Sequence, residues 1–350
     1  MPIAKSILDL RTLRRNSRPS VNIIGSNNGA GLSVDARLIR RLLIAEGFHV
    51  KWSTKPTLAR WHRWLETHAV LGWTQPWYDT NLFLERFSPL WFGYAKQNIL
   101  IPNPEWFVDE QFEHFAGIDE VFCKTEEAAR IFQALGKKVT WTGFTGRDCW
   151  EGTLAATRPM RALHLAGRSE LKGTRYVLEV WRRHPEWPEL TVVKRPHGDI
   201  SELDTSPANN LRFMVERLSE KDIQVIRQEH PLWILPSEVE GYGQTLSEGL
   251  SVGAIVMTTD AAPMNEIIRP DRGVLVRARH ADRMHLGNRH IVESEALEVA
   301  VSNVLDWTPE RRLAVGAAAR KWFVENDQRF RRDISDSLGS GSQRAARQVR

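Results

Sequence analysis

The sequence predicts an α/β protein built from two βα domains in tandem. Two sets of short apolar segments alternate with segments of helical periodicity, one set before residue 142 and the other after residue 160. The 350 residues are enough for two domains, and 42% of them are apolar, which allows a sizeable core. Residues 142–159 are rich in glycine, threonine and charged side chains without periodicity, so they form the predicted linker.

The first set opens with a β-branched run at 21–25, a glycine-bearing loop and a helix over 34–46. Further strands are expected at 48–52, 98–101, 120–123 and 139–142, with a helix over 126–135. The second set predicts strands at 161–166, 190–193, 215–218, 232–235 and 254–258, and helices at 173–183, 220–229 and 245–252. Ligands of open parallel sheets bind at the carboxyl ends of strands, so two such domains predict a ligand cleft between them.

These elements place one domain at residues 1–150 and a second at 151–310. Residues 311–336 are expected to form C-terminal helices that pack back towards the first domain, and 337–350 a disordered basic tail. The longest apolar stretches are far shorter than the roughly 20 residues of a membrane span, and no secretory leader is recognisable. Cys123 and Cys149 form no C-x-x-C pair, which argues against both a disulfide framework and a thiolate zinc site and fits a cytoplasmic protein.

The net charge of +5 is concentrated at the two ends. Residues 1–20 and 329–350 carry +4 each, which leaves −3 for the rest of the chain. Residues 3–15 have an amphipathic pattern that suits either an anionic membrane, at its inner face, or packing on the protein's own first domain. Solvated termini are the third interpretation. The body of the chain has no basic stripe with interleaved aromatic residues, which disfavours nucleic acid.

The segment 236–253, P-S-E-V-E-G-Y-G-Q-T-L-S-E-G-L-S-V-G, joins the end of a strand to the start of a helix through a glycine loop. A helix N-terminus suits a phosphate, and the carboxylates of Glu240 and Glu248 suit sugar hydroxyls. The loop and first turn predicted to bind a ligand are Gly241, Tyr242, Gly243, Gln244 and Thr245. Alternatively, Thr245 and Glu248 form a T-x-x-E capping box, which explains Glu248 without a ligand.

This segment resembles the E-x7-E signature of retaining GT-B glycosyltransferases, family 4 in particular. Residues 254–268 resemble the strand and turn that follow it, 163–174 (L-H-L-A-G-R-S-E-L-K-G-T) resemble the G-R…K-G motif, and 28–35 resemble the N-terminal glycine loop. The resemblance implies the GT-B fold, in which two Rossmann-like domains face each other across a cleft. It also implies a hexosyl- or pentosyltransferase that uses a nucleotide-sugar donor and a hydroxyl acceptor: a glycan, a lipid-linked acceptor or a small molecule.

The resemblance assigns roles to individual residues of the second, nucleotide-sugar-binding domain. Glu248 corresponds to the glutamate that binds the ribose, and Glu240 to the one that faces the donor sugar. Arg168 and Lys172 match the basic pair that holds the diphosphate, and with Glu240 they make up the expected catalytic set. Four positions separate Arg168 from Lys172 where the motif usually has five. An isolated lysine such as Lys172 is otherwise interpreted as a solvated loop residue.

The first domain is expected to bind the acceptor. Gly29 and Gly31 lie in a loop that is either a plain β–α turn or a ligand loop, because the dinucleotide fingerprint is incomplete. Many family members carry a histidine after a middle strand, but residues 99–107 have none, so Asn103 and Glu105 are the polar candidates there. His114 is interpreted as a packing or surface residue.

No D-x-D occurs in the chain, so no metal and no cofactor are expected. The tryptophans at 61, 64, 73, 77, 91 and 106 are either core residues or walls of an acceptor pocket. Two other functions remain open: a glycosyltransferase acting on modified bases in DNA, which the basic composition suggests, and a non-catalytic sugar-binding protein on the same fold.

Overall fold

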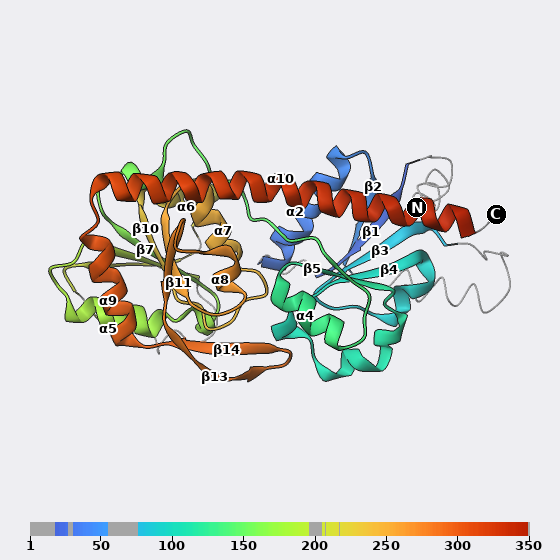
Figure 1. Ribbon diagram of the computed structural model, residues 1–350, viewed down its shortest axis with the longest axis horizontal. Helices are drawn as coiled ribbons and strands as arrows, with labels where there is room; N and C mark the ends of the chain where they lie inside the picture. The colour runs from blue at the N-terminus through green and yellow to red at the C-terminus, as the bar shows by residue number, and fades with distance from the viewer. Residues whose placement is uncertain are drawn as a thin grey trace. The chain divides into compact units, whose positions relative to one another are not determined.

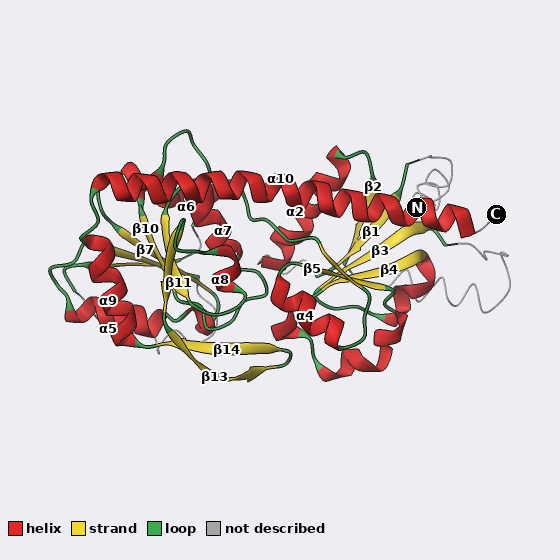
Figure 2. Ribbon diagram, viewed as in Figure 1, coloured by secondary structure: helices red, strands yellow, loops and turns green. Residues whose placement is uncertain are grey.

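The computed structural model describes residues 18–26, 31–54, 76–195, 205–206, 208–216 and 218–348, with side chains up to residue 339. The chain divides into two compact units (Figure 1). Unit 1 comprises Met1–Gly143 and Arg329–Arg350, and unit 2 comprises Phe144–Gln328. Each unit is a six-stranded parallel sheet with helices, which confirms the predicted α/β class (Figure 2). The amphipathic segment at 3–15 and the three tryptophans at 61, 64 and 73 lie outside the described residues.

The sheet of unit 1 has the strand order β2-β1-β3-β4-β5-β6, in which the order reverses between β1 and β3. Its strands are β1 (Ser20–Ile24), β2 (His49–Ser53), β3 (Tyr78–Leu84), β4 (Ala95–Ile101), β5 (Glu120–Cys123) and β6 (Val139–Trp141). Its helices are α2 (Gly31–Ala45) and α4 (Glu126–Ala134), with 3₁₀ turns at Pro89–Tyr94, Pro104–Trp106 and Asp109–Gly117.

Strand β3 was not predicted, because a polar residue lies in its buried centre. Asn81 is fully buried, and its register places it between Asn22 of β1 and Asn98 of β4. The Asn22 Nδ2 donates to the Asn81 Oδ1 at 3.1 Å, and the Asn81 Nδ2 donates to the Asn98 Oδ1 at 2.9 Å. These bonds across three strands satisfy side chains that would otherwise be costly to bury.

The sheet of unit 2 has the order β12-β11-β10-β7-β8-β9, the doubly wound Rossmann order. Its strands are β7 (Ala162–Gly167), β8 (Leu190–Lys194), β9 (Leu211–Val215), β10 (Leu232–Leu235), β11 (Ile255–Thr259) and β12 (Gly273–Val276). Its helices are α5 (Thr174–Arg183), α6 (Glu220–Glu229), α7 (Gln244–Ser251), α8 (Met264–Ile267) and α9 (Ser294–Leu305), with short 3₁₀ turns at Ala155–Thr157 and Glu170–Lys172. Helices α5 and α9 cover one face, where Trp181 and Val301 pack on the central strands.

Three parts of unit 2 and the C-terminus differ from the prediction. The strand expected at 215–218 lies at 211–215, since Leu211 and Phe213 pack against the core instead. Strand β12 and the antiparallel hairpin of β13 (Ala278–Met284) and β14 (Gly287–Val292) were not predicted. The hairpin is rich in charged and polar residues, and only Gly287 and Val292 in it are buried, so it has no apolar run. The tail expected to be disordered from 337 continues as helix to Gln348, with Leu338 buried.

Helix α10 (Pro309–Gln348) contributes to both units. In unit 2, Phe323 is buried and the Asn326 Nδ2 donates to the carbonyl of Phe144 at 2.7 Å. In unit 1, Ile334 is buried and the guanidinium of Arg329 lies 5.4 Å from the ring centre of Trp141. Among the described helices, α10 included, we find none that is both long and apolar enough to cross a membrane.

Candidate functional site

The carboxyl ends of β7 and β10 lie side by side where the strand order of unit 2 reverses. The loop after β7 carries Arg168 and Lys172, and the loop after β10 carries Glu240. Ligands of doubly wound sheets bind at such a reversal point. Residues predicted from two separate motifs therefore lie in neighbouring loops at the position where this fold binds ligands.

Two ion pairs surround the end of β7. The Lys172 Nζ contacts the Glu240 Oε1, with only 21% and 14% of the two side chains exposed. The Lys194 Nζ, at the end of β8, donates to the Glu170 Oε1 at 2.7 Å, and Lys194 is buried. Arg168 is exposed and makes no ion pair with any residue in the described part of the chain. The strand ends thus gather three cations, the kind of charge that a diphosphate requires.

His164 supports this loop from inside the sheet. Its Nδ1 lies 2.6 Å from the carbonyl of Ile234 and must donate, because a carbonyl only accepts. Its Nε2, 2.9 Å from the Thr174 Oγ1, then accepts from that hydroxyl. The neutral ring thereby ties β7 to β10 and to the start of α5. Burial lowers the pKa of His164 to about 4, and the charges of Lys172 and Lys194 act in the same direction.

We expect His164 to make the protein lose stability as the pH falls from about 6.5 towards 4. The unfolded chain binds a proton near its ordinary pKa while the folded chain resists it, so unfolding takes up a proton in this window. The pKa shift corresponds to about 3 kcal/mol of unfolding free energy. This stability is present in full above the ordinary pKa of histidine and is lost as the pH falls. Urea unfolding of the wild type and of His164→Gln at several pH values measures this contribution. Because all other groups titrate in both proteins, the difference between their pH slopes belongs to His164. Equal pH slopes for the two would contradict this assignment.

Gly173 allows the two loops to approach each other. Its φ is +69°, and a Cβ at this position would lie 2.3 Å from the carbonyl oxygen of Pro236. Gly167, at the other end of the same loop, has a φ of +61° but no atom within 4 Å of such a Cβ. Both glycines therefore have a left-handed backbone conformation, but only Gly173 lies so close to another segment that a side chain would collide with it.

This pair provides a prediction with its own control. Gly167→Ala is expected to cost about 1–2 kcal/mol of stability, the penalty of a left-handed backbone for an L-residue. Gly173→Ala is expected to cost clearly more, because the methyl group also displaces the carbonyl of Pro236. Urea midpoints of the two variants measure the difference, and equal losses would show that the close approach is unimportant.

Glu248 has a partner that was not predicted from the sequence. Its Oε2 accepts from the Arg227 Nη2 of α6 at 2.5 Å, and the side chains are 9% and 11% exposed. Helix α7 starts at Gln244 with Gly243 as its N-cap, so Thr245 lies within the helix. The alternative of a capping box between Thr245 and Glu248 was therefore wrong.

The remaining predicted donor-binding residues surround the start of α7. Gly241, Tyr242 and Gly243 are buried, whereas Gln244 and Thr245 are half-buried on the first turn. The ring of Tyr242 packs edge-to-face on the ring of Phe144, with 5.3 Å between the ring centres, and this contact anchors the loop. Of the five, Gln244 and Thr245 are the two that are not buried.

In unit 1 the predicted Asn103 belongs to a network at the carboxyl ends of the strands. Its Nδ2 donates to the Glu85 Oε2 at 3.0 Å, and its Oδ1 accepts from the Lys124 Nζ at 3.0 Å. The same Nζ donates to the Asp35 Oδ2 of α2 at 2.7 Å, a buried ion pair. Gly31 is the first residue of α2, and Gly29 lies outside the described residues.

The other polar and aromatic candidates of unit 1 divide between core and surface. Glu105 is buried, and His114 is exposed in a 3₁₀ turn. Trp91 is buried and packs edge-to-face on Tyr94, whereas Trp106 is 40% exposed. The core interpretation therefore holds for Trp91 but not for Trp106.

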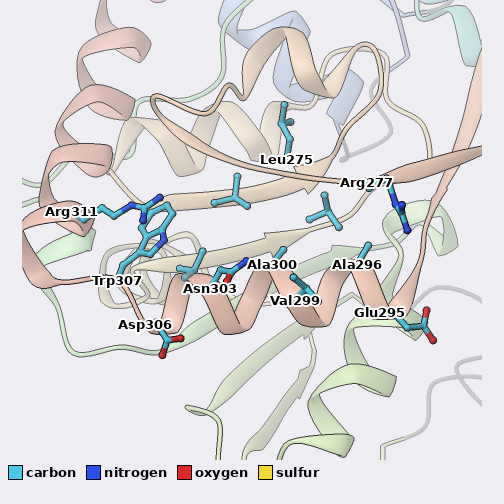
Figure 3. A pocket seen from close by; sticks show the side chains of 13 residues that line it. Leu275, Arg277, Glu295, Ala296, Val299, Ala300, Asn303, Asp306, Trp307 and Arg311 are labelled. Atoms are coloured by element: carbon cyan, nitrogen blue, oxygen red, sulfur yellow. The ribbon is translucent and has the colours of Figure 1, made fainter.

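A hollow of about 820 Å³ lies elsewhere in unit 2, between β12, α9 and the start of α10 (Figure 3). Its walls are mostly aliphatic, and Arg311 lies 4.2 Å above the ring of Trp307 at one end. None of the predicted site residues lines it. It is separate from the cations at the ends of β7 and β8.

No family model and no curated protein matches the chain. Solved structures do. A sucrose-phosphate synthase from Thermosynechococcus elongatus is 13% identical with a TM-score of 0.62, over 95% of this chain and 99% of that one. A glycosyltransferase from Rickettsia africae is also 13% identical with a TM-score of 0.62, over 93% and 99%. HepE from Anabaena, in complex with UDP and glucose, is 14% identical with a TM-score of 0.61, over 94% and 98%. The chain has the GT-B fold of these proteins, as the sequence motifs predicted.

Proposed function

We propose that the chain is a retaining glycosyltransferase that moves a sugar from a nucleoside-diphosphate donor to a hydroxyl acceptor. The observation that carries the proposal is the contact between Lys172 and Glu240 at the reversal point of the unit 2 sheet, with Arg168 exposed beside it and Lys194 close by. The structural neighbours support it, since HepE is solved with UDP and glucose.

The cations would act on the leaving group. A nucleoside diphosphate gains negative charge as the bond to the sugar breaks, and fixed positive charges stabilise it in the transition state. Arg168 and Lys172 are assigned this role, and the amides at the start of α7 add the positive end of the helix dipole. With these charges in place, and without a D-x-D motif in the sequence, we propose a reaction that needs no metal.

The two glutamates of the E-x7-E segment take different parts. Glu240, which contacts Lys172, is assigned to the donor sugar. Glu248 is assigned to the ribose through its second carboxylate oxygen, since Oε2 is held by Arg227. The cation of Arg227 offsets the cost of burying the Glu248 carboxylate, and a carboxylate accepts stronger hydrogen bonds from hydroxyl groups than a neutral oxygen does.

The acceptor is assigned to the carboxyl edge of the unit 1 sheet. Gly31 opens α2 there, and Asn103 is held in place by Glu85 and Lys124. Gly29 is part of the same proposed loop. A hydroxyl of a glycan, of a lipid-linked acceptor or of a small molecule would be the attacking group, with no protein nucleophile.

Release of nucleoside diphosphate from a panel of nucleotide sugars, beginning with UDP-glucose, tests the proposal. We expect one donor to be turned over, faster with acceptor than by hydrolysis alone. The anomeric configuration of the product, determined by NMR, tests retention separately. If no donor on the panel yields diphosphate, the proposed function is wrong.

A further inference from the structure

Glu238 connects the two loops of the proposed donor site to a third element, the hairpin β13–β14. It lies two residues before Glu240 and is 4% exposed. Its backbone amide donates to the carbonyl of Leu171, in the loop after β7, at 2.8 Å. Its own carbonyl accepts from the amide of His290, in β14, at 2.8 Å. One residue thus fixes the spacing between three segments.

The carboxylate of Glu238 is held by two arginines. The Arg175 Nη2 of α5 lies 3.5 Å from its Oε1, and the Arg289 Nε of β14 lies 3.4 Å from its Oε2. Arg289 also pairs with Asp282 of β13 at 3.0 Å, which braces it across the hairpin. The Arg175 side chain is 68% exposed and that of Arg289 30%, so Arg289 is the more enclosed partner.

We infer that the hairpin β13–β14 acts as a latch: it holds the donor loop, residues 237–241, in place, and Arg289 is the positioning residue through which it does so. The inference rests on the proposed function in that the loop at 237–241 carries Glu240. Arg289 reaches the loop through Glu238 and touches no reacting group. Its effect is to hold residues 237–241 in the conformation that presents Glu240 beside Lys172.

Physical chemistry favours a strong effect at this contact. A carboxylate taken out of water is costly unless a cation remains with it. Without Arg289, Glu238 keeps, among the described residues, only the 3.5 Å hydrogen bond from Arg175, whose side chain is 68% exposed, and the carboxylate regains solvation if the loop moves outwards. The dependence is mutual, because an isolated two-stranded hairpin is marginally stable and needs an anchor on the rest of the fold.

The test compares Arg289→Ala with Arg283→Ala in the full-length protein. Arg283 is on the same hairpin, is exposed, and makes no ion pair with a residue that the structure describes, so it matches the loss of charge without the contact. Hydrogen–deuterium exchange of residues 237–241 needs no ligand and reports the latch itself. Affinity for UDP, GDP and ADP, measured by calorimetry, reports its effect on the donor site.

We expect faster exchange in 237–241 and an affinity for the preferred diphosphate weaker by about tenfold in Arg289→Ala. Arg283→Ala should match the wild type in both, and Arg289→Lys should recover part of the affinity. In the background of Glu238→Gln, adding Arg289→Ala should change the affinity less than about twofold, because the charge that it holds is gone. Equal effects of Arg289→Ala in both backgrounds, or equal behaviour of Arg289→Ala and Arg283→Ala, would overturn the latch. A wild type that binds none of the three diphosphates, with faster exchange in Arg289→Ala, would overturn the proposed function and leave the latch standing.

Discussion

Replacing Lys172 with alanine is expected to lower donor turnover by about 10²–10³-fold, the loss typical of removing one group that stabilises developing negative charge. The effect follows from the position of Lys172 at the end of β7, where its Nζ contacts Glu240. The measurement is the rate of nucleoside-diphosphate release at saturating donor, compared with the wild type.

The matched control is Lys321→Ala. Lys321 lies on α10 and its side chain is 77% exposed. Its one ion-pair contact within the described part of the chain is at 4.0 Å, to Glu325, so its loss should leave the rate unchanged. Urea unfolding of both variants shows whether the fall in rate exceeds any fall in stability. A Lys172→Ala enzyme with the wild-type rate would remove Lys172 from the reaction.

Arg227→Met is expected to cost about 3–5 kcal/mol of unfolding free energy, the range for breaking a buried ion pair from one side. The change leaves the carboxylate of Glu248 buried without its cation. The Nε and Nη1 atoms of Arg227 have no hydrogen-bond partner among the described residues, so the pair with Glu248 accounts for most of the loss. The double variant with Glu248→Gln should regain part of it, because the stranded charge is gone.

The control for this prediction is a solvent-exposed ion pair with a similar distance between its charged atoms. Arg130 lies 2.8 Å from Glu127 on α4, with 68% of its side chain exposed. Arg130→Met should cost less than about 1 kcal/mol, since solvent screens such pairs. Urea midpoints and slopes measure both variants. If Arg227→Met is no worse than Arg130→Met, the Glu248 ion pair contributes nothing to the fold.

The fold was predictable where hydrophobic pattern and environment agree. Strands β5 and β10 and helix α6 have the predicted bounds, because each is a short apolar run or a clear helical repeat. Strand β3 was not recognised from the sequence because its buried centre holds the polar Asn81. The side chain of Asn81 forms hydrogen bonds with Asn22 and Asn98, which belong to other strands and are distant in the sequence. Helix α10 continues into the expected tail, where Leu338 is buried in unit 1, and no local pattern in the sequence reveals that contact.

The sequence motifs identified several residues of the candidate site, but they did not show which side chains contact one another. Lys172 and Glu240 were assigned from two separate segments, and the structure places them against each other. Arg227 was missed because it lies 21 positions before Glu248, on a helix whose pattern gave no reason to single it out. Only weak signals in the sequence pointed to Lys194 and Glu238: Lys194 directly follows the strand predicted at 190–193, and Glu238 directly follows P-S.

The central claim is that the reversal point of the unit 2 sheet binds a nucleoside diphosphate, and a thermal unfolding series with UDP, GDP and ADP tests it most directly. A ligand that binds only the folded state at about 100 times its Kd adds about 2.7 kcal/mol of stability. We predict that one of the three raises the Tm of the wild type and of Lys321→Ala but not that of Lys172→Ala. No shift with any diphosphate, or the same shift in Lys172→Ala as in the wild type, would contradict the claim.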